Sequence, residues 1–426
     1  MRSSVKKLLL VAFALGFVAQ VAWAADTELR FSWWGGDARH KPTLDAIKLF
    51  EAANPGIKIK AEYMGWGGYP ERLTTQISGG NEPDIMQINW AWISTMYSKK
   101  GDGFYDLYKA KDVLKLDEWG SNVNYGVRNG KLNAIPISFT ARFYLWQKNT
   151  LDKAGIAMPK NWDELFSAGK AFEKLGPDYY PIDGVYYDVF LMSHAYLMQK
   201  TGKQWIDPNT DTVTLTKAEA LDWVKFYKKC TETRAVVPHK LRLSIAPPEA
   251  PTEQQQQWVN GQWAGNYTWD STFKTRMSSL PKTTICDVGE FLSLPNPKNI
   301  GFFGRPTMMF AVSKNSKNPV IGAKFINFLL TDPAAVKVLS DTRGIPMAKS
   351  SYDLLAKENL FTALDMKSLV QLKKAKIDPP SAWLESAKIQ ELLRSIFEEV
   401  SLGKSTDEQA VDRIINETNQ VLKSIQ

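Results

Sequence analysis

The residues best suited to chemistry in this chain are aromatic side chains that end predicted strands. Trp33 and Trp34 follow a predicted strand over residues 28–32 and precede two glycines. Indole rings are costly to leave in water unless a flat, partly apolar molecule covers them. The glycines allow such a molecule to approach the backbone closely. The two tryptophans therefore predict a stacking platform for a ring such as a sugar, with core packing as the alternative.

The same pattern occurs twice more along the chain. Trp66 lies among glycines after a predicted strand over residues 57–61, and Asn89 and Trp90 follow a predicted strand over residues 84–88. Predicted helices over about 42–53 and from about 70 to 78 separate these strands. In an open α/β sheet, ligands bind beyond the carboxyl ends of the strands. Three tryptophan-bearing turns at one sheet edge therefore favour a shared ligand platform.

A fourth aromatic segment, residues 261–270, alternates aromatic and small residues and reads as a strand that enters a binding loop. Trp269 is the predicted stacking platform of this segment. Asp270 is a candidate acceptor for hydroxyl groups. Lys274 follows as a candidate partner for a carboxylate.

Four arginines stand beside these segments or near predicted turns. They are Arg39, Arg142, Arg305 and Arg343. An arginine binds a carboxylate with two parallel hydrogen bonds, so these residues predict recognition of an acidic ligand. For Arg39 an exposed position at a helix start is the alternative, and for Arg142 a structural ion pair.

The chain begins with the pattern of a secretory leader. Arg2, Lys6 and Lys7 precede an apolar run over residues 8–18, and Ala22-Trp23-Ala24 fits a cleavage site. We therefore predict a signal peptide over residues 1–24 and an exported, soluble mature protein. About 400 further residues are too many for one hydrophobic core, so two domains are expected.

Composition excludes several classes of function. The formal net charge of +8 is spread along the chain, and no nucleic-acid-binding module is present. The three histidines and two cysteines do not have the spacing of metal ligands, so neither a metal site nor a cofactor is predicted. Cys230 and Cys286 can either pair or remain buried thiols. The chain contains no phosphate-binding motif of an ATPase.

Taken together, these segments resemble the extracellular solute-binding proteins of ABC importers, in the group that captures sugars. The resemblance rests on four segments in order: residues 29–34, residues 50–59, Gly79-Gly80-Asn81-Glu82-Pro83-Asp84-Ile85, and the late series 310–346. Within that group, residues 31–40, the Gly65-Trp66 turn and Asn89-Trp90-Ala91-Trp92 are most similar to the proteins that bind oligogalacturonides, which are fragments of pectin.

The resemblance implies an α/β fold with the two-lobed clamshell architecture of periplasmic binding proteins and a multi-segment hinge. The N-terminal lobe would comprise residues 25–140 and 309–345, and the C-terminal lobe residues 141–308 and 346–426. Residues 344–346 are a short segment suited to a hinge. The series Ile389, Leu392, Leu393, Ile396 and Val400 predicts an amphipathic helix that faces the core of the second lobe.

The implied function is capture without catalysis. A monomeric periplasmic protein would bind an oligogalacturonide or a related acidic oligosaccharide between its lobes and deliver it to the permease complex of an ABC importer. The alternatives are a neutral oligosaccharide or a glycosaminoglycan fragment as ligand and, more remotely, a periplasmic pectin-degrading enzyme. Convergence of Arg39, Arg142, Lys274 and Arg305 in the cleft would favour the acidic ligand.

Overall fold

The computed structural model describes residues 27–96, 103–208, 210–247, 250–375 and 380–425. The predicted signal peptide, residues 1–24, lies outside the described residues. The strands are β1 (Thr27–Trp34), β2 (Ile57–Met64), β3 (Ile85–Ile88), β4 (Val127–Arg128), β5 (Lys131–Leu132), β6 (Ile135–Gln147), β7 (Tyr180–Ile182), β8 (Trp263–Trp269), β9 (Cys286–Val288), β10 (Gly304–Val312) and β11 (Ile345–Pro346).

The α-helices of the first half of the chain are α1 (Asp37–Ala53), α2 (Tyr69–Ser78), α3 (Trp92–Thr95), α4 (Lys148–Ala154), α5 (Trp162–Glu173), α6 (Tyr186–Thr201), α7 (Lys217–Glu232) and α8 (His239–Ile245). Those of the second half are α9 (Gln256–Val259), α10 (Phe273–Met277), α11 (Pro319–Thr331), α12 (Pro333–Leu339), α13 (Lys349–Lys357), α14 (Ala363–Lys374), α15 (Ala387–Ser401), α16 (Asp407–Asp412) and α17 (Thr418–Ile425). Short 3₁₀ helices include η4 (Asp270–Thr272) and η5 (Ala382–Glu385). In the described residues, no helix is both long enough and apolar enough to span a bilayer.

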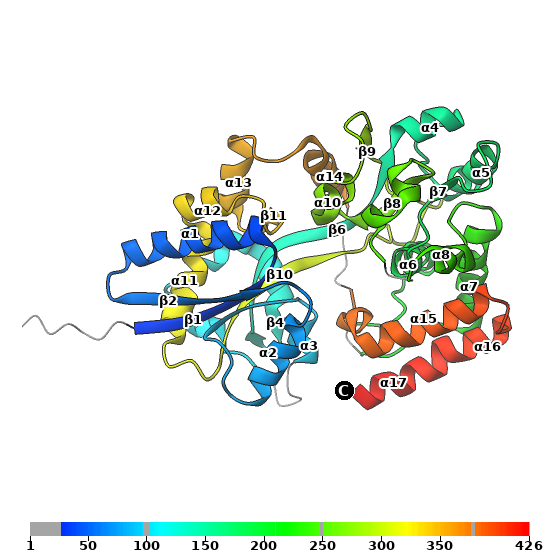
Figure 1. Cartoon of the computed structure of the whole chain (residues 1–426). Coiled ribbons are helices and arrows are strands. Elements are labelled where there is room, and N and C mark those ends of the chain that lie inside the picture. The colour runs from blue at the N-terminus through cyan, green and yellow to red at the C-terminus, as the bar shows by residue number, and fades with distance from the viewer. Residues whose placement is uncertain (1–26, 97–102, 209, 248–249, 376–379, 426) are drawn as a thin grey trace, which may run out of the picture.

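One sheet runs through both halves of the molecule in the order β2-β1-β3-β10-β6-β8-β7. β1 pairs in parallel with β2 and β3, so the carboxyl ends of these three strands lie at one edge, as the sequence predicted. The first half of β6 pairs with β10, and its second half pairs with β8 and β9. β6 and β10 therefore link the two halves of the structure (Figure 1).

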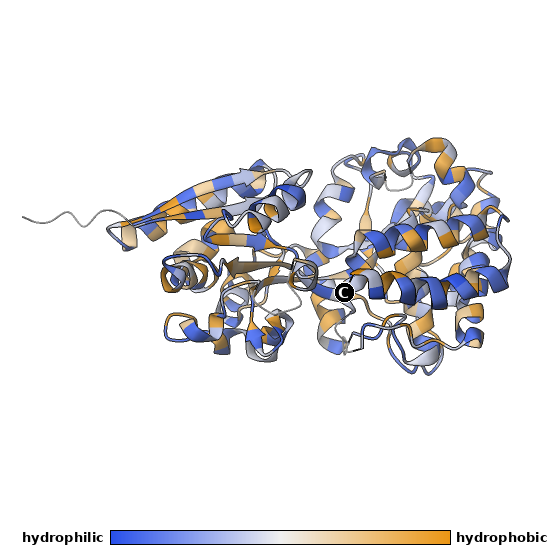
Figure 2. Cartoon of the chain, turned by 90° about the horizontal axis from the view of Figure 1, so that it is seen from below, coloured by the Kyte–Doolittle hydropathy of each residue, from blue (hydrophilic) through white to orange (hydrophobic). Residues whose placement is uncertain are grey.

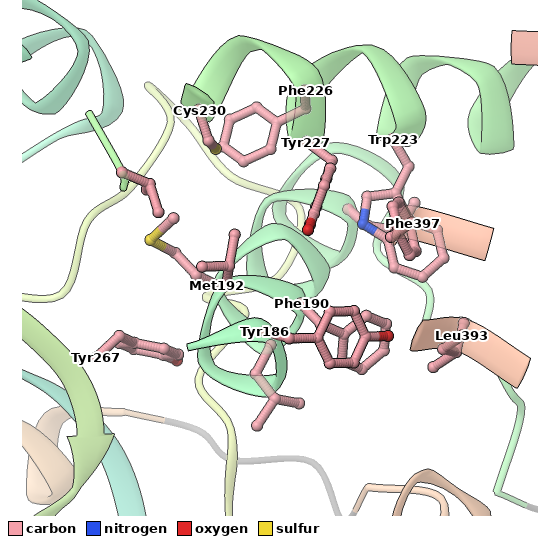
Figure 3. Packing of buried hydrophobic residues seen from close by; sticks show 14 of the residues in the cluster. Tyr186, Phe190, Met192, Trp223, Phe226, Tyr227, Cys230, Tyr267, Leu393 and Phe397 are labelled. Atoms are coloured by element: carbon pink, nitrogen blue, oxygen red, sulfur yellow. The ribbon is translucent and has the colours of Figure 1, made fainter. Parts of the chain in front are cut away.

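Each half has its own hydrophobic core. The first core gathers β1, β3, α1 and α11 around residues such as Phe31, Phe50 and Phe325. The second gathers α6, α7 and α15, whose side chains Phe190, Trp223 and Phe397 point toward one another (Figure 3). We call these halves the first and the second lobe. Two α/β lobes joined by crossing strands make a two-lobed α/β fold, and the extents of the lobes given above remain a prediction.

The C-terminal helix pattern predicted from the sequence is confirmed. In α15, Ile389, Leu392, Leu393, Ile396 and Val400 are all buried in the second core. The terminal helix α17, whose end is marked C, carries hydrophobic and hydrophilic residues in turn along its length (Figure 2). An apolar stripe at helical spacing packs inward because burial removes that surface from water.

Two boundaries near the N-terminus differ from the prediction. β1 extends through Trp34, so both tryptophans lie within the strand and not after it. Helix α1 begins at Asp37 and contains Pro42 in its second turn, where the predicted helix began. Pro42 is the sixth residue of α1, beyond the four N-terminal amides that lack a partner, so it cannot donate the intrahelical hydrogen bond that residue 42 would otherwise make to the carbonyl of Ala38.

Candidate functional site

A pocket lies between the two lobes. Its volume is about 830 Å³. The first lobe contributes residues from 90 to 128, and the second lobe contributes residues 198–214, 299, 380 and 382. Most of the lining side chains are polar: Ser94, Ser121, Asn122, Asn124, Arg128, Lys203, Gln204, Asp207, Asp211, Thr214 and Asn299. We call this space the interlobe pocket. Amides and charged groups at this density suit a hydroxyl-rich ligand.

An aromatic cluster lies at the carboxyl ends of β1, β2 and β3. Trp66 stacks on Trp92 with 5.6 Å between ring centroids, and its ring meets Trp34 edge to face at 5.1 Å. Tyr69 contacts both Trp34 and Trp92. Trp66 is 50% exposed, whereas Trp34 is 8% exposed. The first-lobe aromatic cluster is therefore a packed group with one open ring, that of Trp66.

Trp33 is not part of that cluster, which corrects the expectation that both neighbouring indoles face a ligand. Consecutive side chains of a strand point to opposite faces of the sheet. Trp33 accordingly packs under α1, fully buried, between Phe31 and Tyr63. Its indole N–H donates to Nδ1 of His40 at 3.1 Å.

Asn89 and Trp90 lie where the third strand ends. The side-chain oxygen of Asn89 accepts a hydrogen bond from the amide of Ala91 at 2.9 Å, which shapes the turn into α3. Trp90 is 8% exposed, and part of its surface lines the interlobe pocket. Of the first-lobe residues predicted for the site, Trp90 is the one that lines this pocket.

On the second lobe, the indole ring of Trp269 contacts two guanidinium groups. The guanidinium carbon of Arg142 is 4.5 Å from the centroid of the indole ring, and that of Arg305 is 4.7 Å from it. Arg142 also lies 5.6 Å from the ring centroid of Tyr187. We call Trp269, Arg142 and Arg305 the cationic platform. Guanidinium groups stack on indole faces because the ring quadrupole attracts a cation.

Both arginines of the cationic platform have carboxylate partners. Arg142 donates through Nη1 to Asp188 and to the carbonyl of Tyr267, and the ion pair is almost fully buried. Arg305 donates through Nε to Glu385, which is in η5. Among the described residues, Nη2 of neither arginine makes a hydrogen bond to protein. Each arginine therefore keeps one amino group for another acceptor.

Helix η5 joins the cationic platform to the interlobe pocket. Glu385 pairs with Arg305, and Ala382 at the other end of η5 lines the pocket. The hydroxyl of Tyr187 donates to the carbonyl of Leu384 in the same turn. The cationic platform and the polar pocket are thus neighbouring parts of one interlobe region.

The remaining four predicted residues gather elsewhere. Arg39, Asp270, Lys274 and Arg343 line a smaller cavity of about 230 Å³, which shares no lining residue with the interlobe pocket. We call this the hinge cavity, because β11 beside it pairs with the linking strand β6. In Figure 1, α10 and β11 lie on one side of the linking strands, and α3 and β4 lie on the other.

In the hinge cavity, the cationic side chains are bonded to other residues of the protein. Lys274 forms an ion pair with Asp341 across the lobes. Arg39 donates to the carbonyls of Trp34 and Thr342, and Arg343 donates to Gln87 and Thr43. Arg142 and Arg305 meet at Trp269, whereas Arg39 and Lys274 lie in the hinge cavity, and none of these four cations is among the residues that line the interlobe pocket.

Burial shifts the protonation equilibria in the hinge cavity. Desolvation raises the pKa of Asp270 to about 7, although Thr140 Oγ1 and the amides of Ala141 and Ser271 donate to its carboxylate. Desolvation also lowers the pKa of Arg39 to about 10. Asp270 is 5% exposed, so its predicted role as an acceptor for ligand hydroxyls is not supported by this placement.

Sequence reasoning missed the polar residues of the interlobe pocket, including Arg128 and Asp211. Arg128 precedes Asn129-Gly130, a dipeptide typical of two-residue hairpin turns, and β4 and β5 do form a hairpin there. The dipeptide could have revealed the hairpin. It could not have revealed that Arg128 meets Asp211 of the other lobe, because the two are far apart in the sequence.

No group of histidine, cysteine and carboxylate side chains in the described residues has the arrangement of a metal site. Cys230 is buried and Cys286 is partly buried, and both are free thiols. The two cysteines, left open by the sequence, are therefore not paired in this structure.

Comparison with known proteins gives a consistent result. The family model for bacterial extracellular solute-binding proteins matches residues 36–336. A periplasmic solute-binding protein of Pectobacterium atrosepticum superposes with a TM-score of 0.88 at 35% identity, over 94% of this chain and 99% of that one. A periplasmic oligogalacturonide-binding protein of Yersinia enterocolitica, solved with saturated digalacturonic acid, superposes with a TM-score of 0.84 at 34% identity and the same coverage.

Among curated relatives, a binding protein of Brucella abortus is 29% identical over 226 residues. The alignment spans 50% of this chain and 52% of that relative, so it covers about half of either protein. The family model covers well over half of the chain, and the solved structures cover nearly all of it. This chain therefore belongs to the bacterial extracellular solute-binding protein family.

Proposed function

We propose that this protein captures oligogalacturonides between its two lobes and delivers them to an ABC importer. The observation that carries the proposal is the cationic platform, in which two arginines contact one indole ring. An indole face covers the C–H surface of a sugar ring, and the free amino groups of the arginines can donate to a uronate carboxylate. The Yersinia enterocolitica relative, which binds digalacturonic acid, supports the same ligand class.

Capture would depend on movement of the lobes. We take residues 25–140 with 309–345 as one lobe, and residues 141–308 with 346–426 as the other. A ligand that contacts both lobes favours the closed arrangement, since only that arrangement makes both sets of contacts. The closed monomer would then dock on the permease complex. The leader over residues 1–24 would direct the protein to the periplasm.

A neutral oligosaccharide is the second candidate, and one observation favours it. Arg142 and Arg305 are already paired with Asp188 and Glu385, so the cationic platform is close to electrically neutral. The interlobe pocket adds amides that serve hydroxyl groups without any need for charge. A glycosaminoglycan fragment, with both acidic and neutral sugars, would also suit this combination.

We assign no reaction to the protein. A glycosidase needs two carboxyl groups that face each other across the scissile bond. Asp270 lines the hinge cavity, and the two acids that line the interlobe pocket, Asp207 and Asp211, lie together on the second-lobe wall and not on opposite walls. Capture without catalysis is the function that this placement supports.

Calorimetric titration tests the proposal. The protein without residues 1–24 is titrated with digalacturonate and, in parallel, with its dimethyl ester, which has the same size and no carboxylate charge. We expect 1:1 binding of the acid, weaker binding of the ester, and no product after long incubation. Equal binding of both ligands would replace the acidic ligand with a neutral one, and turnover of the acid would overturn the binding function.

A further inference from the structure

An ion pair crosses the interlobe pocket between Arg128 and Asp211. Nη2 of Arg128 lies 3.4 Å from Oδ2 of Asp211, and both residues line the pocket. Arg128 belongs to the β4–β5 hairpin of the first lobe, whereas Asp211 follows α6 in the second lobe. The two side chains therefore meet inside the space that the ligand is proposed to occupy.

The backbone on the Arg128 side is fixed. Asn129 and Gly130 both have positive φ, at 51° and 71°, as a type I′ hairpin turn requires. The side-chain amide of Asn133 donates to the carbonyls of Arg128 and Lys131, which ties the two strands of the hairpin together. A guanidinium presented by such a short, bonded hairpin has a defined place at the edge of the pocket.

The backbone on the Asp211 side is fixed as well. Asp211 has φ of 53°, a left-handed conformation that aspartate tolerates better than most residues. Its amide donates to the carbonyl of Asp207 at 2.9 Å, and the amide of Asp207 donates to the carbonyl of Thr212 at 2.9 Å. These two hydrogen bonds hold Asp211 beside Asp207 on the second-lobe wall of the pocket.

The contact between Arg128 and Asp211 is weak for an ion pair. It uses a single nitrogen and a single oxygen at 3.4 Å, and the Arg128 side chain is 38% exposed. Water screens such a contact, and it lacks the two parallel hydrogen bonds of a strong arginine–carboxylate pair. A second carboxylate that reached Arg128 with both oxygens would bind it better than Asp211 does.

We propose that Arg128 reads a carboxylate of the ligand, and that Asp211 occupies this position until the ligand displaces it. This inference rests on the proposed function, because it requires an acidic ligand in the interlobe pocket. Asp211 then competes with the ligand carboxylate for Arg128. A neutral sugar does not displace Asp211 from Arg128. The protein therefore favours acidic ligands, whose carboxylate can displace Asp211, over neutral ones.

The test compares Asp211→Asn, Arg128→Gln and the double variant with the unaltered protein. Each is titrated with digalacturonate and with its dimethyl ester. We expect Asp211→Asn to bind the acid about threefold to fivefold more tightly, which is the range that release from an exposed ion pair allows. We expect Arg128→Gln to bind the acid about tenfold more weakly, and neither change to alter binding of the ester more than twofold.

The double variant and a distant control complete the experiment. In the Arg128→Gln background, Asp211→Asn should have no further effect, because its competitor role acts only through Arg128. Asp353→Asn is the matched control, since Asp353 forms an exposed ion pair with Lys349 on α13, away from the pocket. Arg128→Lys keeps the charge without the forked donors, and should lie between Arg128→Gln and the unaltered protein.

Each outcome is decisive. Weaker acid binding by Asp211→Asn would overturn the competitor role, and would show that the ion pair holds the lobes together. No change in acid binding by either single variant would also overturn it, while leaving the proposed function in place. Failure of the unaltered protein to bind digalacturonate would overturn the proposed function and this inference together.

Discussion

The first-lobe aromatic cluster and the cationic platform use the same side chain in two different ways. In the cluster, Trp34, Trp66 and Trp92 pack against one another, and Trp66 is half exposed. In the platform, Trp269 is held by Arg142 and Arg305. An indole packed on indoles offers apolar surface to any sugar, whereas an indole in contact with guanidinium groups lies beside donors for a carboxylate.

Selectivity for an acidic ligand would come from only one of these two regions. Under the proposed function, the indole rings of both regions would stack on sugar rings whether or not these carry a charge. The arginines of the cationic platform would distinguish an acid from its ester. These two contributions can be separated when each variant is titrated with digalacturonate and with its dimethyl ester.

Removal of the platform ring should have the largest effect. We expect Trp269→Ala to weaken binding of both ligands about 30-fold to 100-fold, because truncation of a central aromatic residue typically costs about 2 kcal/mol or more. It also removes the surface on which the two arginines rest. Calorimetry measures the loss. An effect below threefold on both ligands would show that Trp269 is a packing residue.

Replacement of one arginine of the cationic platform should weaken binding of digalacturonate and not of its ester. We expect Arg305→Gln to weaken binding of digalacturonate about tenfold, and to change binding of the ester less than twofold, because only the acid gains a charge-assisted hydrogen bond. Glu385→Gln is the matched control. It releases Arg305 from its partner and should strengthen binding of the acid. Parallel losses for acid and ester would mean that Arg305 has only a structural role.

Removal of the open ring of the first-lobe aromatic cluster should have a smaller effect. We expect Trp66→Ala to weaken binding of both ligands about threefold, since this half-exposed ring contributes stacking without charge. The unfolding temperature of the Trp66→Ala variant should differ little from that of the unaltered protein. A loss of binding confined to digalacturonate would mean that the first-lobe aromatic cluster also distinguishes the acid from its ester, which is expected of the cationic platform alone.

Changes in the hinge cavity should leave binding untouched. We expect Asp270→Asn to change the dissociation constant less than twofold, because Asp270 lines the hinge cavity and not the interlobe pocket. A larger change would show that the hinge cavity takes part in ligand binding.

Asp270→Asn should, however, change the pH dependence of stability. Burial raises the pKa of Asp270 from 3.8 to about 7 in the folded protein. Between these values the folded state holds a proton that the unfolded state has lost, so the free energy of unfolding falls as pH rises, by up to about 1.4 kcal/mol per pH unit. The difference between the variant and the unaltered protein, measured by denaturant titration from pH 4 to 8, should show this slope. A difference independent of pH would contradict the raised pKa.

Much of the fold was predictable because its signals are local. The glycines that end α2, the strand residues 57–61 and the apolar stripe of α15 each depend on neighbours within a few positions. The sequence-based predictions were wrong where packing against a neighbouring layer of the structure fixed the position of a side chain. Trp33 and Trp34 are adjacent in the sequence, yet the pleat of β1 buries Trp33 under α1 and leaves Trp34 beside Trp66.

The sequence predicted α/β elements with tryptophans at the carboxyl ends of three parallel strands, because hydrophobic periodicity and turn residues specify such elements locally. The two-lobed architecture was implied by the family resemblance. The partners of the cations became evident only in the tertiary structure. Arg142 meets Asp188, Arg305 meets Glu385, and Lys274 meets Asp341, in each case across more than 40 positions of sequence. The place of a charge depends on the partner that folding brings to it, and no local pattern contains that partner.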